Sequence, residues 1–281
     1  MAKISVIGIC GNSIFMNVDH FHEKGETLQA INVFEEIGGK GINQAVACAK
    51  MGAEVSFLGA IGDDVDGKKC RQTVNDYGIN DFLVIKKGMK TTFAVILTDK
   101  NGENQVTGFR NAELTAEDLL CFEDEIASSD ILLLQQEVPE EVNETAVEMA
   151  NKHNIRVILN PAPIRKIPNK IIESVFVVTP NEQEKKAIDI DRFKNVITTL
   201  GSKGCSINDK TCIKAIKVRP VDTTGAGDTF NGVLSVCLAE GKDFGTACKY
   251  AVCASGLSIT KKGVLNSIPT REEIERKMTN E

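Results

Sequence analysis

A run of small residues in front of an expected helix is the strongest chemical signal in the sequence. Gly225, Ala226 and Gly227 lead into a helical pattern at 226–240, and Asp228 follows within its first turn. Backbone N–H groups at a helix start have no intrahelical acceptor and lie at the positive end of the dipole. Such a turn can act as an anion hole for a transferring phosphoryl group. Asp228 could accept a proton from an attacking hydroxyl, or it could serve only as a favourable N-terminal carboxylate.

A second glycine-rich string precedes another expected helix. Gly38 and Gly39 come directly before Lys40, and helical spacing puts Lys40 and Asn43 about one turn apart, within reach of one polyol. The same glycines would also suit a hinge, so the residues alone leave site and hinge open. No G-x-x-x-x-G-K-[ST] string occurs, and no G-x-G-x-x-G follows the first strand, which disfavours Walker A and dinucleotide sites.

Short apolar runs alternate with amphipathic helical patterns along most of the chain. The runs are typical of strands buried on both faces of a parallel sheet. We expect these strands at 4–9, 55–61, 131–134, 156–159, 175–179 and 196–200. We expect helices at 41–51, 140–151, 226–240 and 270–281, the last with Thr270 and Glu273 in a capping box. The alternation predicts an α/β fold with helices on both faces of a doubly wound sheet.

Two segments, 12–36 and 91–111, interrupt this alternation with mixed polar and apolar residues. We predict that they form strands of a small separate sheet that covers the site, above the hinge at Gly38 and Gly39. The predicted domains are an α/β core made of 1–12, 36–90 and 112–281, and a small β lid made of 13–35 and 91–111.

Charge and composition exclude several classes of function. The formal net charge of −6 disfavours nucleic acid as a partner, and no apolar stretch approaches the roughly 20 residues of a membrane span. The N-terminus has no secretory pattern. The nine cysteines include no C-x-x-C pair, and we expect Cys48, Cys237, Cys248 and Cys253 to be small core residues. We therefore expect a cytoplasmic protein with a small-molecule partner and no membrane contact.

Several strings resemble, in order and over nearly the whole chain, the ribokinase-like (PfkB-type) carbohydrate kinases. They are Gly25-Glu26-Thr27, Gly38-Gly39-Lys40-Gly41, Gly62-Asp63-Asp64, Asn160-Pro161-Ala162-Pro163, Thr179-Pro180-Asn181-Glu182, the 199–204 and 222–228 strings, Lys262-Gly263 and Ser267-Ile268-Pro269. The resemblance implies a three-layer α/β/α sandwich with a mostly parallel central sheet and a small β-sheet lid that often pairs with another subunit's lid. It also implies ATP-dependent transfer of the γ-phosphate to a hydroxymethyl group of a small sugar or sugar-like acceptor.

The resemblance further implies roles for individual residues. Asp228 resembles the catalytic base, and Gly225, Ala226 and Gly227 resemble the anion hole. The positions that resemble sugar contacts are Gly39, Lys40, Asn43 and Glu137. Those that resemble nucleotide and Mg²⁺-linked positions are Asn181, Glu184, Thr199, Gly201, Ser202, Lys203, Gly204 and Gly227. The loops that match an activating monovalent cation (K⁺) site contain Asp222, Thr224, Ser258, Lys261, Gly263 and Ser267. An ordinary loop residue is the alternative at each position.

The sequence also departs from the family pattern. Counting without gaps from Gly8 to Gly25 places Ser13 where the family has a sugar-binding aspartate. A serine offers one short neutral contact where a carboxylate accepts from two hydroxyls, so we expect an acceptor different from ribose or less hydroxylated. Arg110 resembles a carboxylate-binding position of related keto-acid-sugar kinases, or it is a solvated lid residue. The short passage after Glu182 predicts a peripheral helix reduced to 183–189.

Two other functions remain open at this point. A nucleoside kinase of the same superfamily would use a broader, more apolar acceptor pocket. A non-catalytic protein that senses sugars or nucleotides could use the same scaffold. The intact 225–228 string favours an enzyme, because a sensor does not need a base.

Overall fold

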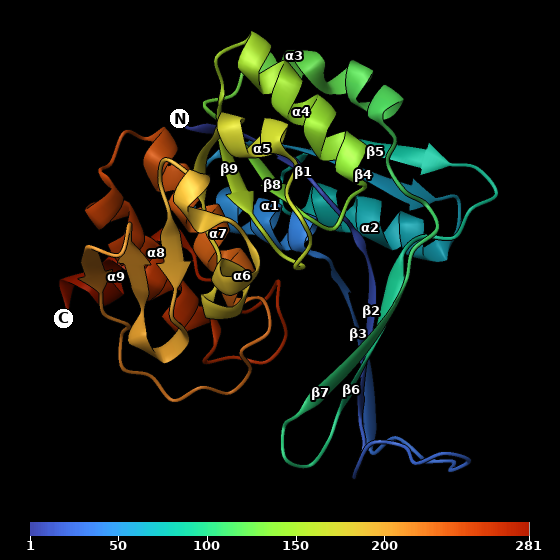
Figure 1. Cartoon of the computed structure of the whole chain (residues 1–281). Helices are drawn as coiled ribbons and strands as arrows, with labels where there is room; N and C mark the ends of the chain where they lie inside the picture. Colours follow the sequence, from blue (N-terminus) through green and yellow to red (C-terminus); the bar gives the residue numbers. More distant parts are fainter. Residues whose placement is uncertain (281) are drawn as a thin grey trace.

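A computed structural model of the chain describes residues 1–280 and has a six-stranded sheet at its centre (Figure 1). In spatial order its strands are β10 (Val175–Val178), β9 (Arg156–Asn160), β8 (Ile131–Gln135), β1 (Lys3–Ile7), β4 (Glu54–Gly62) and β5 (Asn80–Lys86). Every neighbouring pair is parallel. The expected strand at 4–9 ends two residues earlier than predicted, at Ile7.

Both faces of this sheet are buried, which explains the continuous apolar runs. In β8, Ile131 and Leu133 belong to the hydrophobic cluster on one face, whereas Leu132 and Leu134 belong to the cluster on the other. β5 was missed from the sequence because it is an edge strand in which only Leu83 is fully buried. Edge strands lack the continuous apolar signal of central ones.

Helices cover both faces of the sheet and make the three-layer α/β/α sandwich that was predicted. One layer contains α1 (Lys40–Lys50), α2 (Val65–Asp76), α7 (Ala226–Ala239), α8 (Phe244–Ser258) and α9 (Arg271–Thr279). The other contains the 3₁₀ helix η1 (Ala116–Phe122), α3 (Glu123–Ala127), α4 (Glu140–Lys152) and α5 (Asn169–Ser174). The capping box of Thr270 and Glu273 is present at α9, and the predicted end of that helix at Glu281 lies outside the described residues. Within residues 1–280 no helix is long and apolar enough to cross a membrane.

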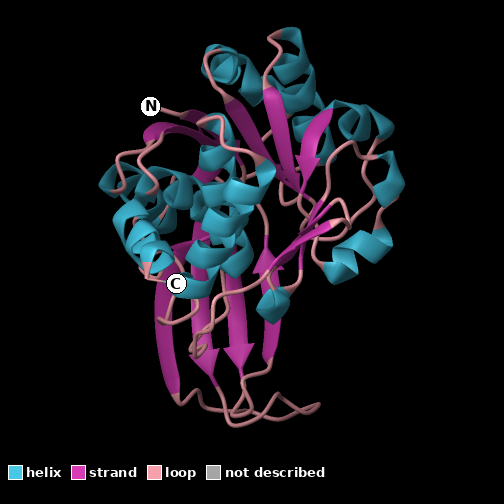
Figure 2. Cartoon of the chain, turned by 90° about the vertical axis from the view of Figure 1, so that its left-hand side faces the viewer, coloured by secondary structure: helices cyan, strands magenta, loops and turns pink. Residues whose placement is uncertain are grey.

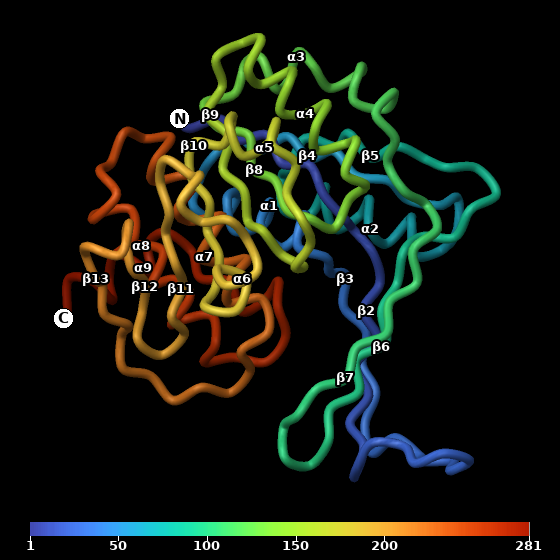
Figure 3. The backbone as a smooth tube through the Cα atoms, viewed as in Figure 1, coloured from blue at the N-terminus to red at the C-terminus, as the bar shows by residue number. Residues whose placement is uncertain are grey.

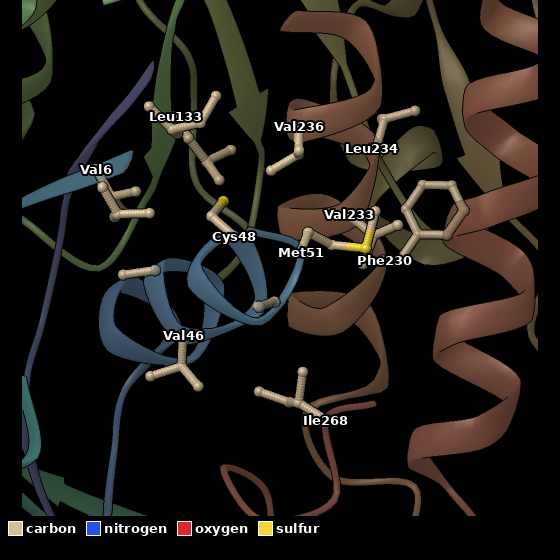
Figure 4. Packing of buried hydrophobic residues seen from close by; sticks show 14 of the residues in the cluster. Val6, Val46, Cys48, Met51, Leu133, Phe230, Val233, Leu234, Val236 and Ile268 are labelled. Carbon is tan, nitrogen blue, oxygen red and sulfur yellow. The ribbon is translucent and has the colours of Figure 1, made fainter. Parts of the chain in front are cut away.

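Tight packing of α1 against α7 sets the geometry of the site. Figure 4 shows Cys48 on α1, and Met51 directly after it, next to Val233 and Val236 on α7. A Cβ atom on Gly232 would lie 2.5 Å from the Ala47 Cβ, so the glycine lets the two helices approach closely. The first turns of both helices follow the two glycine-rich strings, and this contact brings those turns together.

The predicted core cysteines are confirmed, since Cys48, Cys237, Cys248 and Cys253 all lie in the hydrophobic cluster beneath these helices. Burial raises the pKa of the Cys48 thiol well above its usual value and that of Cys237 to about 12. These two thiols therefore stay protonated and act as small apolar groups.

The prediction that 196–200 belongs to the central parallel sheet is wrong. β11 (Ile197–Thr199) pairs antiparallel with β12 (Cys205–Ile207), which pairs with β13 (Thr211–Ile213) in a separate sheet. Figure 3 shows this sheet beside α6 (Glu182–Ala187) and α8. An isolated parallel bridge between Val178 and Val196 still connects this sheet to β10. An apolar run alone therefore did not show whether this segment is a further strand of the central sheet or part of a separate hairpin. The peripheral helix is as short as predicted: α6 is followed only by the 3₁₀ turn η2 (Ile190–Arg192).

The two interrupting segments form a four-stranded sheet that extends away from the helices (Figures 1 and 2). Its spatial order is β3 (Asn32–Gly38), β2 (Gly11–Asn17), β6 (Phe93–Thr98) and β7 (Asn104–Phe109). The β2–β6 pair is parallel and the outer two pairs are antiparallel. We call these four strands the small sheet. Around the first predicted lid segment, 13–35, its strands begin two residues earlier, at Gly11, and end three residues later, at Gly38. Those of the second segment, 91–111, lie within its bounds, from Phe93 to Phe109.

Candidate functional site

The start of α7 has open space beside Gly227, and the N–H of Ala226 donates to the Thr223 carbonyl at 3.3 Å. Gly225 is the N-cap residue with a left-handed φ of 74°, and a Cβ there would lie 2.3 Å from Val264 Cγ1. A Cβ on Gly227 would meet no atom within 4 Å. The turn at Gly225–Gly227 lies at the positive end of a 14-residue helix, where an anion could bind, and we call it the anion-binding turn.

Two amide side chains from consecutive residues of α1 hold the carboxylate of Asp228. Asn43 Nδ2 donates to Asp228 Oδ2 at 2.9 Å, and Gln44 Nε2 donates to Asp228 Oδ1 at 3.0 Å. Asp228 is 6% exposed, and Asn43 Oδ1 has no hydrogen-bond partner among the described residues. The carboxylate is thus fixed in one orientation at the edge of the open space, as a general base must be.

Gln44 extends this contact into a buried amide network. Its Nε2 also lies 3.2 Å from Asn160 Oδ1, and its Oε1 accepts from Gln135 Nε2 at 2.7 Å. Gln135 and Asn160 end strands β8 and β9, so the network lies at the carboxyl edge of the parallel sheet, where α/β proteins bind ligands. Gln44 was not predicted as a site residue. The only signal was its place in the second glycine-rich string, and helical periodicity did not show that it faces Asp228.

We expect Gln44→Met to lower turnover about tenfold and stability by about 1–3 kcal/mol, because it leaves buried polar atoms of Asp228 and Gln135 without a partner. The measurements are steady-state kinetics and urea unfolding. Gln72→Met is the matched control, since Gln72 makes its hydrogen bond on the exposed face of α2. Equal effects of the two substitutions would contradict a positioning role for Gln44.

Lys40 places a positive charge among three carboxylates. The attraction of Asp228 raises its pKa above the usual lysine value, and Glu137 and Glu184 add to this against the opposing effect of burial. The backbone N–H of Lys40 donates to Glu137 Oε2 at 2.8 Å. Burial raises the pKa of Glu137, although the Lys40 charge and this hydrogen bond act in the opposite direction. Lys40 therefore remains protonated beside the anion-binding turn.

A cavity of about 160 Å³ adjoins Lys40, Asp228 and the Gly225–Gly227 turn. Its lining includes Lys40, Asn160, Ala162, Thr179, Asn181, Glu184, Thr199, Thr223, Gly225, Ala226, Gly227, Asp228 and Asn231. The predicted anion hole, base, lysine and three of the predicted nucleotide residues are thus brought together. Five lining residues were not predicted as site residues. Asn160, Ala162, Thr179 and Thr223 lie within the strings that carried the resemblance, and Asn231 lies three residues after the last residue of the 222–228 string. The volume suits phosphoryl groups, and the N–H groups of the turn suit their charge.

The predicted nucleotide residues lie on two adjoining turns. Asn181 caps α6 in a capping box with Glu184, and a parallel bridge joins Asn181 to Thr199. The residues Gly201, Ser202, Lys203 and Gly204 form the next turn, of which the first three are exposed. Glu184 lines the cavity, and its carboxylate accepts from the N–H and the Nδ2 of Asn181. One or two carboxylates together with phosphate oxygens are the usual ligands of Mg²⁺. The donor set therefore fits Mg²⁺ held on a bound nucleotide.

The predicted cation loops lie directly behind the anion-binding turn. Asp222 Oδ1 accepts from the Thr224 N–H at 3.0 Å, and Asp222 Oδ2 accepts from the Gly263 N–H at 3.2 Å. The remaining predicted positions, Ser258, Lys261 and Ser267, are in the segment that ends α8 and the loop after it. No three His, Cys, Asp or Glu side chains gather as a metal site in residues 1–280. Backbone carbonyls with one carboxylate are chemically suited to a monovalent cation.

Five predicted acceptor residues lie outside the cavity lining. Asn43 and Glu137 contact Asp228 and Lys40, which do line the cavity, and Gly39 directly precedes Lys40. Ser13 and Arg110 are the other two. Ser13 is on β2, and its Oγ lies 2.9 Å from the position that a Cβ on Gly38 would occupy. Arg110 follows β7, is exposed, and is close enough to Glu137 for its charge to lower that residue's pKa. Both residues belong to the small sheet or its edge, so their distance from the cavity depends on the position of that sheet.

A carboxylate held in one orientation beside a helix start, on an α/β/α scaffold, could position and stabilise a transferred phosphoryl group. Comparison with known proteins defines the family. The profile of the pfkB family carbohydrate kinases matches residues 1–271, so the chain belongs to that family. The predicted fold class and the predicted activity, an ATP-dependent carbohydrate kinase, are confirmed.

Three similar proteins illustrate the match. The ribokinase of Haemophilus influenzae is 35% identical over 96% of this chain and 96% of its own length. The deoxyribokinase of Salmonella typhi is 30% identical, also over 96% of both chains. The crystal structure of a ribokinase from Thermotoga maritima has 36% identity and a TM-score of 0.90, with 100% of both chains covered.

Proposed function

We propose that the chain phosphorylates the hydroxymethyl group of a pentose, with ATP as the donor. The observation that carries this proposal is Asp228, held by Asn43 and Gln44 in the first turn of α7 next to the Gly225–Gly227 turn, which has open space beside Gly227. A base and an anion hole within one helical turn can act on the attacking hydroxyl and on the transferred phosphoryl group together.

In this mechanism Asp228 accepts the proton of the acceptor hydroxyl as it attacks the γ-phosphorus in line. The amides of Gly225–Gly227 stabilise charge on the equatorial oxygens, and the Lys40 ammonium adds a positive charge at the same place. Mg²⁺ bound to the nucleotide beside Glu184 would neutralise the β- and γ-phosphates. A K⁺ ion in the loops of Asp222 and Gly263 would support the turn from behind.

The small sheet acts as a lid in this proposal, made of residues 13–35 and 91–111, and the rest of the chain is the kinase core. Its position at the carboxyl edge of the central sheet, and the positive φ of 112° at Gly39 directly after β3, support a hinge at this point. Closure would bring Ser13 and Arg110 toward the acceptor and exclude water from the phosphoryl group.

Because Ser13 is the residue at the predicted sugar-binding position, 2-deoxyribose should be compared directly with ribose as the acceptor. Its hydroxyl can accept fewer hydrogen bonds from sugar hydroxyls than a carboxylate in the same place. Similar proteins include both a ribokinase and a deoxyribokinase. We expect Ser13→Asp to shift preference toward ribose.

The test is ADP release from ATP, with Mg²⁺ and K⁺, across pentoses, deoxypentoses, hexoses, keto-acid sugars and nucleosides. We expect turnover with ribose or 2-deoxyribose. Turnover only with nucleosides would favour a nucleoside kinase. Turnover with a keto-acid sugar, lost in Arg110→Ala, would assign the acceptor carboxylate to Arg110. ATP binding without ADP release for any acceptor would favour a sensor.

We also propose that the chain forms a homodimer through the small sheet. Large apolar residues are exposed on it, namely Val33, Phe34, Val106 and Phe109. On one face Phe15 and Phe34 stack with ring centroids 4.6 Å apart, in line with Ile96 and Val106 on the neighbouring strands. A second copy of the sheet would cover this apolar surface.

We expect Val106→Glu to convert the dimer to a monomer in light-scattering measurements of molar mass, because it puts a charge in the proposed interface. Val65→Glu is the matched control: Val65 is 68% exposed, compared with 64% for Val106, but lies on α2. A wild-type protein that is already monomeric at micromolar concentration would contradict the dimer.

The free-thiol core and a small-molecule acceptor support a cytoplasmic location, which fractionation of the native cells would check.

A further inference from the structure

The carboxylate of Glu36 joins the small sheet to the loop behind the anion-binding turn. Its Oε2 accepts from the Val264 N–H at 2.8 Å, and its Oε1 accepts from the Leu265 N–H, also at 2.8 Å. A Cβ on Gly263 would lie 3.0 Å from Oε2, so the glycine lets the loop approach the carboxylate. A carboxylate that receives two backbone N–H groups is a strong, orientation-specific contact. It joins segments 228 residues apart in the chain.

The loop that Glu36 holds is in direct contact with the phosphoryl site. Val264 Cγ1 occupies the space that a Cβ on Gly225 would need, so its side chain packs on the first residue of the turn. Gly263 donates its N–H to Asp222 Oδ2, and Asp222 Oδ1 accepts from Thr224, one residue before the turn. A shift of the 263–265 loop would therefore move the turn from two sides.

Glu36 also lies next to a predicted acceptor residue on the small sheet. It is directly opposite Ser13 in the β2–β3 register, and Gly38 and Gly39 follow two and three residues later. The adjacent carboxylate, Glu35, points to the other face of the sheet. It pairs with Lys69 on α2 at 2.9 Å and accepts from Asn12 Nδ2 at 3.1 Å. Consecutive residues of β3 thus contact different parts of the core, and of these two carboxylates it is Glu36 that contacts the 263–265 loop.

We propose that Glu36 is a positioning residue whose carboxylate couples the position of the small sheet to the geometry of the Gly225–Gly227 turn. The inference rests on the proposed function, since it assigns the coupling to phosphoryl transfer. Closure of the sheet over an acceptor then fixes the 263–265 loop, and the loop fixes the anion hole. Conversely, phosphate bound at the turn stabilises the closed sheet, because coupling between two sites is reciprocal.

The test compares Glu36→Ala, Glu36→Gln and the matched control Glu35→Ala in the full chain. Hydrogen–deuterium exchange is measured at Val264, Leu265 and β3, with and without Mg²⁺ and a non-hydrolysable ATP analogue. In the wild type we expect the analogue to slow exchange in β3. In Glu36→Ala this protection is lost, the two loop amides exchange about tenfold faster, and the analogue binds about tenfold more weakly. Glu36→Gln, which keeps one acceptor oxygen, gives intermediate values. Glu35→Ala behaves as wild type.

Protection of β3 that persists in a folded Glu36→Ala variant would overturn the inference, as would equal effects of the two alanine substitutions. These outcomes are separate from the proposed function. Glu36-dependent protection by the analogue, in a protein that phosphorylates no pentose, would support the coupling and reject the acceptor assignment. Pentose phosphorylation with Glu36-independent protection would do the reverse.

Discussion

Asp228→Asn lowers turnover about 100-fold or more while nucleotide binding stays close to wild type, if Asp228 is the general base. The asparagine is nearly isosteric but cannot accept the proton of the acceptor hydroxyl. Its amide can be accommodated, because Asn43 has an unpartnered Oδ1 that can turn toward it. Steady-state kinetics of ADP release and calorimetric titration of a non-hydrolysable ATP analogue measure the two quantities.

A matched control separates catalysis from helix capping. Asp243 also lies at a helix start, where its side chain accepts from the Thr246 N–H. Asp243→Asn changes the same charge at a helix terminus and alters stability by about 0.3–1 kcal/mol without affecting turnover. If Asp228→Asn behaves in the same way, Asp228 is only a favourable N-terminal carboxylate and another residue must be the base.

Gly227→Ala gives the second large effect, a loss of about 100-fold in kcat/KM, comparable to removal of one anion-hole donor. The new methyl group meets no protein atom within 4 Å, so it projects into the space that the phosphoryl group needs. The helix itself tolerates alanine better than glycine, so the variant melts at or above the wild-type temperature. Kinetics and thermal unfolding measured on the same preparation check both statements.

Gly225→Ala behaves differently, although it lies two residues away. Its φ of 74° is in the left-handed region, and the new Cβ would collide with Val264. We expect a loss of about 1–2 kcal/mol of stability from the backbone conformation alone. If Gly227→Ala lost as much stability as Gly225→Ala, its loss of activity would reflect misfolding, and the space at Gly227 would not be the phosphoryl site.

The sequence predicted the elements whose patterns are local. The apolar runs at β1, β4, β8, β9 and β10 predicted strands buried on both faces, and the structure confirms them because helices cover both sides of the sheet. The glycine and capping patterns predicted the starts of α1, α7 and α9 within one residue. Edge strand β5 and hairpin strand β11 were misjudged, because strand pairing depends on distant residues that an apolar run does not identify.

The residues of the candidate site likewise fall into those that local sequence patterns predicted and those that only tertiary packing placed. The sequence by itself determined the chemical groups, a small-residue turn followed by Asp228, because helix starts and glycine conformations are set within a few residues. Only the tertiary structure decided that Gln44 and Asn43 hold that carboxylate. It also decided that Glu36, on the small sheet, reaches the 263–265 loop. These contacts depend on the packing of α1 against α7 and on where the small sheet lies, and neither follows from local sequence patterns.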